Sequence, residues 1–258
     1  YAVIRKVPMS ADPNVANMAD NRTVTIKTDK KVVSAKNVEK INALAKEREK
    51  GRPLWYVLGT CDFYGYEFKV DERALIPRPE TEELVEVAIG LTKAGDETLD
   101  LCTGSGAIAI TLKLKSGANV TASDISAGAL SLAKENADRL GADVKFVESD
   151  LFENIDGKFN LIVTNPPYIK TGDIERLQRE VKDYEPISAL DGGEDGLDFY
   201  RRIAVGAKSR LVNGGAVLAE IGYDQGEAVE EIFAREGFTV KAFKDLSGND
   251  RIVSAVKV

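Results

Sequence analysis

The tetrapeptide Asn165-Pro166-Pro167-Tyr168 combines residue types that can hold a planar amino group. Its prolines fix φ and carry no backbone N–H, so the carbonyl groups of residues 165 and 166 can face outward as hydrogen-bond acceptors. The Asn165 side chain adds another acceptor, and the Tyr168 ring offers a flat face. This arrangement suits a carboxamide or an exocyclic amine. The alternative interpretation is a rigid turn after a strand.

A second candidate site is the loop Asp100-Leu101-Cys102-Thr103-Gly104-Ser105-Gly106, between a predicted strand and a predicted helix. Its glycines let backbone approach a ligand closely. The helix N-terminus that follows favours anionic groups such as a carboxylate. An ordinary tight turn would have the same pattern. The three-glycine dinucleotide fingerprint is incomplete, because Ala109 stands three residues after Gly106.

Acidic residues follow the next two predicted strands. Asp124 comes about 20 residues after the glycine loop, the interval at which an acid accepts the hydroxyls of a ribose. Its alternative role is a helix N-cap. Asp150 precedes Leu151 and Phe152, and an acid beside apolar residues could frame an adenine ring or form a plain loop. The pattern favours a ligand that contains adenosine.

Composition excludes several kinds of chemistry. The chain of 258 residues contains no histidine, which removes Ser-His and Cys-His nucleophile pairs and His-ligated metal sites. The usual general base near neutral pH is removed as well. Catalysis must therefore rely on positioning, carboxylates or a reactive cofactor. We expect no metal.

Charge, hydropathy and cysteine content indicate which partners and which cellular compartment to expect. The net charge of −7 and the pI of about 5.0 argue against a sequence-independent nucleic-acid binder. There is no apolar run long enough to span a membrane and no signal-peptide pattern. Cys61 and Cys102 suggest neither a disulfide framework nor a metal cluster. We therefore expect a soluble protein of the reducing cytoplasm.

The elements that position these residues alternate regularly after residue 97. We expect strands at 98–102, 120–123, 144–147, 160–164, 216–221, 239–243 and 252–256, and helices at 107–115, 127–140, 199–211 and 227–236. Such alternation predicts an α/β fold with an open, doubly wound, mostly parallel sheet. Only a turn separates the last two strands, so they should be antiparallel to each other. The loops after residues 102, 123, 148 and 164 should meet where the strand order reverses.

The N-terminal part has a different pattern. Residues 11–21 resemble a loop and residues 23–28 a short strand, whereas residues 37–50 have the apolar period of a helix. Residues 63–70 predict a hairpin with aromatic strands. A further helix opens near Arg78, with a proline and acids in its first turn.

Taken in this order, the glycine loop, Asp124 and the tetrapeptide resemble a class I methyltransferase, whose fold is Rossmann-like. The chain closely resembles the PrmC/HemK family of protein-glutamine methyltransferases over residues 37–258. Three further stretches carry the resemblance: Gly51-Arg52-Pro53-Leu54 with Leu58-Gly59 and Phe63-Tyr64-Gly65; Leu75 to Glu82; and Glu185-Pro186 through Ala189-Leu190, Gly192-Gly193 and Asp195-Gly196-Leu197 to Tyr200-Arg201.

The resemblance implies a donor, a substrate and a domain plan. Family members transfer a methyl group from S-adenosyl-L-methionine, leaving S-adenosyl-L-homocysteine, to the glutamine side chain of the Gly-Gly-Gln motif in class I peptide chain release factors. We therefore expect a partly helical substrate-docking domain at 1–62, a linking β-hairpin at 63–78 and a seven-stranded methyltransferase domain at 79–258. Neither a membrane nor direct contact with nucleic acid is expected.

Site residues follow from the motifs together with the resemblance. The expected donor contacts are Asp100, Cys102, Thr103, Gly104, Ser105, Gly106, Asp124, Asp150, Leu151 and Asn165. The tetrapeptide, Asn165 to Tyr168, should hold the substrate amide in line with the methyl donor, without a base. Phe63 is expected to wall the pocket with Tyr168. Arg78 and Glu80 should shape its entrance or, alternatively, form an ion pair at the helix start.

Two departures and three rival functions accompany this reading. Cys102 stands where many family members have glycine, and residues 1–36 are shorter and more strand-like than the helical N-terminus of the family. One rival is glutamine methylation of a ribosomal protein. A second is N6-adenine methylation of nucleic acid, because an exocyclic amine suits the same loop. The third is a binding module without activity, against which the intact loops argue.

Overall fold

The computed structural model describes residues 35–258, which form parts of two compact units divided between Gly51 and Arg52. In the first unit, helix α2 (Ala35–Glu49) confirms the helix predicted over residues 37–50. The loop and strand predicted before residue 29 lie outside the described residues. Residues 52–62, which the sequence interpretation placed in the N-terminal domain, are part of the second unit.

The second unit begins with a short helix and a hairpin. Helix α3 (Leu54–Leu58) ends at Gly59, whose left-handed φ of 78° lets its N–H reach the Trp55 carbonyl. Strands β1 (Thr60–Phe63) and β2 (Tyr66–Lys69) pair antiparallel. The predicted hairpin is confirmed, but it starts at residue 60 rather than 63. Helix α3 was not predicted, because five residues are too few to establish a helical period.

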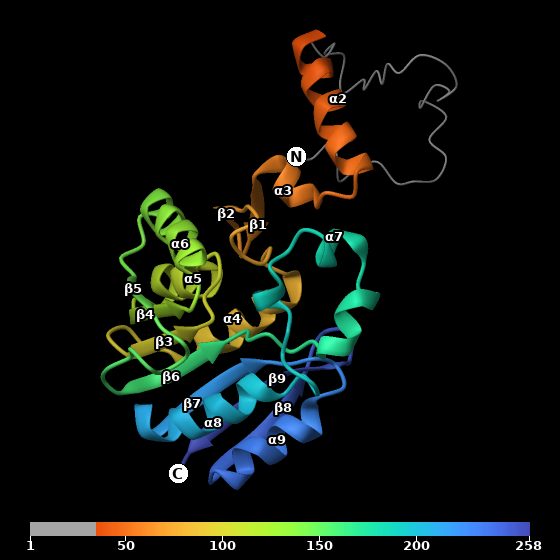
Figure 1. Cartoon of the computed structure of the whole chain (residues 1–258). Helices are drawn as coiled ribbons and strands as arrows, with labels where there is room; N and C mark the ends of the chain where they lie inside the picture. The colour runs from red at the N-terminus through yellow and green to blue at the C-terminus, as the bar shows by residue number, and fades with distance from the viewer. Residues whose placement is uncertain (1–34) are drawn as a thin grey trace. The chain divides into compact units, whose positions relative to one another are not determined.

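A seven-stranded sheet forms the centre of the second unit (Figure 1). Its strands are β3 (Glu97–Leu101), β4 (Asn119–Asp124), β5 (Lys145–Glu148), β6 (Phe159–Thr164), β7 (Leu211–Glu220), β8 (Phe238–Lys244) and β9 (Asp250–Lys257). Their spatial order is β5-β4-β3-β6-β7-β9-β8, so the order reverses between β3 and β6. Only β9 runs against its neighbours, and it pairs antiparallel with both β7 and β8. The doubly wound, mostly parallel sheet is confirmed.

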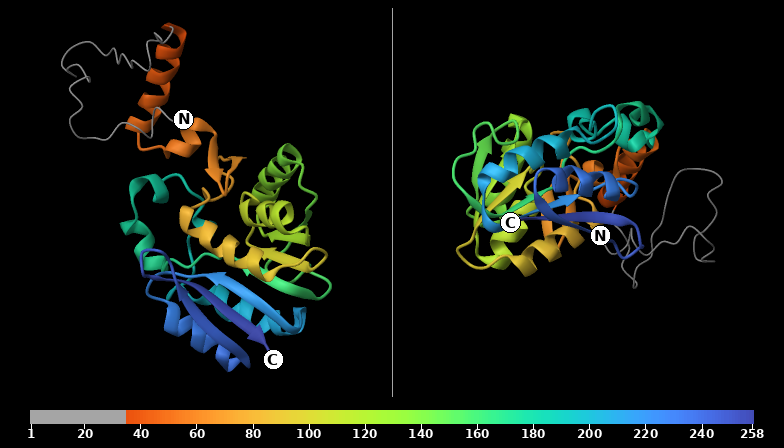
Figure 2. Two further views of the ribbon diagram at one scale, coloured as in Figure 1. Left: turned by 180° about the vertical axis from the view of Figure 1, so that it is seen from behind. Right: turned by 90° about the horizontal axis from the view of Figure 1, so that it is seen from below.

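Helices cover both faces of this sheet, as the two views in Figure 2 show. Helices α4 (Pro79–Leu91), α5 (Ala107–Ser116) and α6 (Ala127–Leu140) pack on one face, and α8 (Asp198–Arg210) and α9 (Gly226–Arg235) pack on the other. The alternation of side chains along β6 reflects this arrangement. Leu161 and Val163 enter the core beneath α4 and α5, whereas Ile162 enters the core beneath α8. The part of β6 that is covered on both faces, Leu161 to Val163, is therefore an uninterrupted apolar run.

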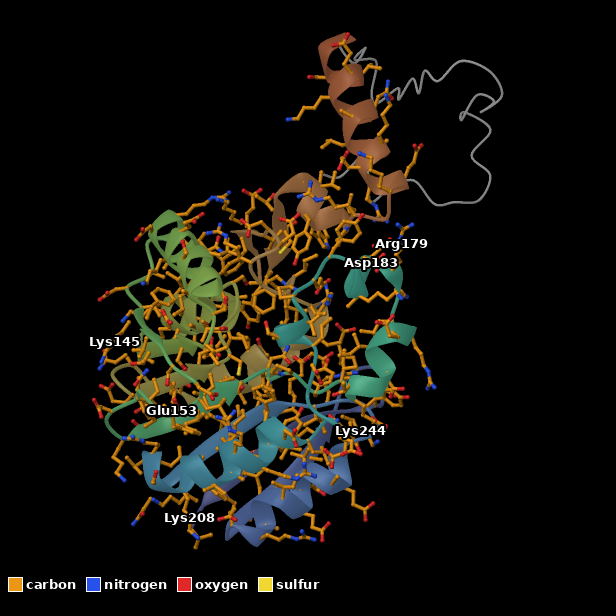
Figure 3. All side chains as sticks on the ribbon, viewed as in Figure 1. Lys145, Glu153, Arg179, Asp183, Lys208 and Lys244 are labelled. Atoms are coloured by element: carbon orange, nitrogen blue, oxygen red, sulfur yellow. The ribbon has the colours of Figure 1, made fainter. Side chains whose placement is uncertain are left out.

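The segment between β6 and α8 contains three short helical pieces that the sequence did not reveal. These are the 3₁₀ turns at Thr171–Arg176 and Ile187–Ala189 and helix α7 (Arg179–Lys182). On α7 the Arg179 guanidinium donates to the Asp183 carboxylate at 2.9 Å, and both side chains are labelled in Figure 3. None of the three pieces is longer than six residues, so no amphipathic period could identify them.

Charged side chains cover the outside of the second unit. Lys145, Glu153, Lys208 and Lys244 are exposed, and all four are labelled in Figure 3. Among residues 35–258, no helix combines the length and the apolar character needed to cross a membrane.

Candidate active site

A cavity of about 530 Å³ lies at the carboxyl edge of the sheet, where the strand order reverses. The loops after β3, β4, β5 and β6 all contribute to its wall, as the sequence predicted. The segments before α4 and before α8 complete it. The sequence-predicted residues that line it are Arg78, Cys102, Thr103, Gly104, Ser105, Asp124, Asp150, Leu151, Asn165 and Pro167.

The glycine loop is held in left-handed backbone conformations. Cys102 has a φ of 59° and Gly104 a φ of 55°. A positive φ is uncommon for a residue with a Cβ, which gives a physical reason for the glycine that many family members have at position 102. Gly106 does not line the cavity. A Cβ there would lie 2.9 Å from the Ile110 Cδ1 and 3.1 Å from the Ala133 Cβ, so Gly106 allows α5 to approach α6.

Asp100 lies beneath the glycine loop rather than in the cavity. Its side chain is fully buried, and one carboxylate oxygen accepts hydrogen bonds from the Thr103 hydroxyl at 2.6 Å and the Ala109 N–H at 3.1 Å. Within residues 35–258, its other oxygen has no hydrogen-bond partner. Burial raises the pKa of Asp100 to about 7. Asp100 therefore shapes the loop from below, and the direct donor contact expected of it is not supported by this position.

Asp124 lines the cavity and organises the residues around it. One of its oxygens accepts the Gly104 N–H at 2.9 Å, and the other accepts the Ser126 N–H at 2.9 Å. The N-cap of α6 is Ser126, whose hydroxyl accepts the Ala129 N–H, so the alternative role of Asp124 as the cap does not apply. Burial raises the pKa of Asp124, opposed by these backbone hydrogen bonds.

The loop after β5 places an acid beside an apolar residue, as predicted. Asp150 lines the cavity and forms an ion pair with Arg202 at 2.8 Å. Leu151, with a left-handed φ of 50°, also faces the cavity. Beneath them the buried Ser149 hydroxyl donates to the Leu151 carbonyl at 2.8 Å, which holds this strained turn in place.

The tetrapeptide after β6 divides between cavity and core. Asn165 and Pro167 line the cavity, and the Asn165 Nδ2 donates to the Thr81 hydroxyl at 3.2 Å. Pro166 is buried. Tyr168 does not line the cavity, because its ring packs with the core beneath α8 and its hydroxyl donates to the Glu220 carboxylate at 3.5 Å. Burial, followed by the nearby Glu220 charge, raises the pKa of Tyr168 to about 12. The amide contact expected of the Tyr168 ring is thus not supported by this arrangement.

Glycines of the segment before α8 pack directly behind the tetrapeptide. A Cβ on Gly192 would lie 2.8 Å from the Pro167 carbonyl oxygen and 2.8 Å from the Tyr168 Cα. A Cβ on Gly196 would lie 2.5 Å from the Tyr168 carbonyl oxygen. The buried Gln225 amide donates to the Tyr168 and Gly196 carbonyls, at 3.0 and 3.2 Å. These glycines, which carried part of the family resemblance, therefore set the position of the loop.

Arg78 and Glu80, expected at the substrate entrance, and Phe63, expected in the pocket wall, lie in different surroundings. Arg78 lines the cavity and donates to both oxygens of the buried Glu185 carboxylate, at 2.6 and 2.7 Å. Glu80 is exposed on the first turn of α4 and does not line the cavity. The expectation that Phe63 walls the pocket is wrong, because Phe63 is buried in the core and packs edge-to-face on Phe68, with ring centroids 5.9 Å apart.

Sequence reasoning missed three polar residues that hold the site together. Asn136 of α6 accepts the Lys69 N–H and donates to the Lys69 and Ser105 carbonyls, so it joins the hairpin to the glycine loop. Thr81 and Glu220 are hydrogen-bonded to each other at 2.7 Å beneath Asn165. Each interrupts an otherwise apolar face or strand, and that interruption was the available signal.

Comparison with known proteins finds methyltransferases. The methyltransferase small domain family model matches residues 83–181. The release factor glutamine methyltransferase of Geobacter sulfurreducens is 46% identical over 213 residues, which are 81% of this chain and 75% of that protein. The enzyme of the same name from Thermodesulfovibrio yellowstonii is 40% identical over 238 residues, covering 89% and 85%.

Solved structures share the fold at lower identity. A methyltransferase from Pyrococcus furiosus superposes with a TM-score of 0.62 at 18% identity, covering 81% of this chain and 98% of that one. The Mtq2–Trm112 complex of E. cuniculi, described as responsible for methylation of the eRF1 translation termination factor, gives a TM-score of 0.53 at 19% identity and covers 72% and 99%. These structures support the class I methyltransferase fold, and the closer sequence relatives decide the family: the chain belongs to the release factor glutamine methyltransferases.

Proposed function

We propose that this protein transfers a methyl group from S-adenosyl-L-methionine to the side-chain amide nitrogen of the glutamine in the Gly-Gly-Gln motif of class I peptide chain release factors. Membership of the family supports the substrate. The observation that carries the proposal is the position of Asn165. Its carboxamide lines the same cavity as Gly104 and Asp124, so an acceptor for an NH2 group stands beside the candidate donor site.

The residues of the cavity fit the donor. The loop at Cys102–Ser105 exposes backbone on which an amino-acid moiety can lie, and Asp124 supplies carboxylate oxygens for ribose hydroxyls. Leu151 offers an apolar contact for the adenine ring, beside Asp150. A volume of about 530 Å³ lies in the range of small-molecule sites. When bound, the donor supplies an electrophilic methyl group on a sulfonium ion.

The chain's own contribution to the reaction is the placement of a weak nucleophile. An amide nitrogen has its lone pair delocalised into the carbonyl, and the chain contains no histidine to act as a base. The Asn165 Oδ1 and the Pro166 carbonyl would accept the two N–H groups and aim the nitrogen into the cavity. Orientation of this kind lowers a barrier by roughly 7 to 11 kcal/mol.

The same two acceptor oxygens would also stabilise the positive charge that develops on the substrate nitrogen. Positive charge grows on the nitrogen as it attacks, so hydrogen bonds from its N–H groups to neutral oxygens strengthen toward the transition state. Each bond gained in this way contributes about 1 to 3 kcal/mol. The buried prolines hold the acceptors rigid, so little reorganisation is needed during the reaction.

The test supplies radiolabelled S-adenosyl-L-methionine with a release factor, its Gly-Gly-Gln glutamine-to-alanine variant, ribosomal protein or DNA. We expect label on the release factor alone and none on the alanine variant. Label on ribosomal protein or DNA instead would replace the proposed substrate. No label anywhere would favour a binding module without activity. Asn165→Ala should abolish labelling while calorimetry still detects donor binding, and near-normal turnover in that variant would remove the role assigned to Asn165.

A further inference from the structure

Three side chains from three elements form a hydrogen-bonded series at the wall of the cavity, which Thr81 and Asn165 line and which Glu220 does not reach. The Thr81 hydroxyl, in the first turn of α4, donates to the Oε2 of Glu220, at the end of β7, at 2.7 Å. The Asn165 Nδ2, after β6, donates to the Thr81 Oγ1 at 3.2 Å. Glu220 is 1% exposed and Thr81 4% exposed, so water does not compete for these bonds.

The chemistry of this series fixes which end of the Asn165 amide faces the cavity. An ionised carboxylate only accepts hydrogen bonds, so the single proton of the Thr81 hydroxyl must go to Glu220. The Thr81 oxygen is then left as an acceptor, and only the NH2 end of Asn165 can satisfy it. The Asn165 Oδ1 is the end that remains for a substrate. This reasoning depends on the partners and not on how the two ends of the amide are assigned.

We propose that Thr81 and Glu220 are positioning residues that hold Asn165 with its carboxamide oxygen toward the substrate. The inference rests on the proposed function, because it explains how Asn165 presents an acceptor rather than a donor to an incoming NH2 group. An Asn165 amide turned by 180° would place two NH2 groups face to face, and the substrate amide would lose its acceptor.

The protonation state of Glu220 sets this orientation. A proton on Glu220 turns the carboxyl into a donor to Thr81, which frees the Thr81 hydroxyl to donate to the Asn165 oxygen and allows the amide to turn. Burial raises the pKa of Glu220 to about 7, opposed by its hydrogen bond from Thr81 and by the Arg251 charge. The exposed Glu80 charge adds to the increase.

The other elements around Glu220 contribute hydroxyl groups. The Tyr168 hydroxyl donates to its Oε1 at 3.5 Å, and the Tyr200 hydroxyl donates to its main-chain carbonyl at 2.8 Å. Burial keeps the pKa of both tyrosines above the usual value, so neither titrates near pH 7. We therefore expect kcat to fall as the pH decreases through the pKa of Glu220.

The first experiment compares Thr81→Val with Thr81→Ser. Valine keeps the shape of threonine and removes the hydroxyl, whereas serine keeps the hydroxyl. Thr81→Val should lower kcat for release factor methylation by about 10- to 100-fold, with the donor dissociation constant unchanged in calorimetry. Thr81→Ser should keep kcat close to the wild-type value. The matched control is Thr92→Val at the C-cap of the same helix, where the Thr92 hydroxyl donates to the Ala88 carbonyl; this variant should leave kcat unchanged.

Glu220→Gln tests the dependence on pH. A glutamine can both donate to and accept from Thr81, so it no longer enforces one orientation. Its kcat should be lower than that of the wild type at pH 8 and nearly flat between pH 6 and 8. If kcat of Glu220→Gln still decreased at low pH as in the wild type, the role of Glu220 would be overturned. An unchanged kcat in Thr81→Val would overturn the role of Thr81.

A substrate-free measurement separates this inference from the proposed function. Side-chain 15N NMR, with the Asn165 signal identified by its loss in Asn165→Asp, reports hydrogen exchange of the Asn165 Nδ2 protons. At pH 8 one of these protons should be protected in the wild type and in Thr81→Ser and unprotected in Thr81→Val. Equal exchange in all three proteins would overturn the inference, even if the release factor is methylated. Protection in a protein that methylates another substrate would support it.

Discussion

At the scale of single residues, the wall of the cavity contains strained backbone conformations and a largely buried carboxylate. Cys102 and Leu151 adopt left-handed backbone conformations at its wall, and Asp124 holds the glycine loop through the Gly104 N–H. Non-glycine residues in such conformations cost about 1 to 2 kcal/mol each and persist where the surroundings require them. The geometry of the donor site is therefore maintained by its packing and hydrogen bonds.

Asp124→Asn should weaken donor binding. An asparagine retains one acceptor and loses the carboxylate, which leaves it poorer at holding both the Gly104 N–H and two ribose hydroxyls. We expect the dissociation constant for S-adenosyl-L-methionine, measured by calorimetry, to rise about 10- to 100-fold. The exposed Asp143 serves as the control, since Asp143→Asn should bind normally. Equal affinity in the two variants would refute the ribose role.

Cys102→Gly tests the strain at the glycine loop. Glycine adopts the φ of 59° without a steric cost, which offsets its greater entropy in the unfolded chain. The free energy of unfolding should stay within about 1 kcal/mol of the wild type or increase. Cys102→Val, whose β-branch makes the same conformation worse, should unfold at a lower urea concentration. If both variants were equally stable, backbone strain at this position would be negligible.

At the scale of elements, the segment between β6 and α8 is the backing of the tetrapeptide. Its Gly192 N–H donates to the Ile169 carbonyl at 2.8 Å, and its glycines approach Pro167 and Tyr168 more closely than any Cβ allows. The Arg78–Glu185 ion pair attaches the same segment to the start of α4. Movement of this segment would therefore shift Asn165 and Pro167 within the cavity.

Gly192→Ala should reduce methyl transfer more than it reduces donor binding. The added Cβ would lie 2.8 Å from the Pro167 carbonyl oxygen, and the backbone must move to relieve that contact. We expect a loss in kcat of at least about 10-fold, since small misplacements of positioning groups have large effects. Gly172→Ala in the same segment meets nothing within 4 Å and should behave as wild type. Full activity in Gly192→Ala would show that the segment does not constrain the loop.

At the scale of the whole molecule, burial of carboxylates makes stability depend on pH. Asp100 and Glu220 both lie within the second unit, and burial raises the pKa of each to about 7. Their unfolded values are about 4, so between these values the folded protein binds protons that the unfolded chain has lost. Stability contributed by these groups is fully present below pH 4 and is lost as the pH rises through 7.

The free energy of unfolding in urea should therefore decrease between pH 5 and pH 8. Each proton held only by the folded state contributes about 1.4 kcal/mol per pH unit to this slope. Groups whose pKa is lowered, such as Asp71 and Asp245, act at lower pH and do not cancel it. The double variant Asp100→Asn, Glu220→Gln should show a flatter profile. A wild-type profile that rises over this range would contradict the assignment.

Much of the fold followed from local pattern. The alternation of apolar strands and amphipathic helices after residue 97 located all seven strands to within a few residues, apart from the start of β7, which begins at Leu211 rather than residue 216. It failed for short pieces, since α3 and α7 have too few residues to show a period. Two-residue alternation in β6 was invisible, because both faces of that strand are buried.

The sequence by itself determined the loops that build the site, since strand ends of a parallel sheet meet at one edge whatever the details of packing. It predicted that Gly104, Asp124 and Asn165 would lie together, and all three line one cavity. Only the tertiary structure decided which neighbouring residues reach that cavity. Phe63 and Tyr168 pack in cores, and Thr81 and Glu220, 139 residues apart, meet beneath Asn165. Such long-range partners depend on how α4 packs against β7, and no local pattern of residues contains that information.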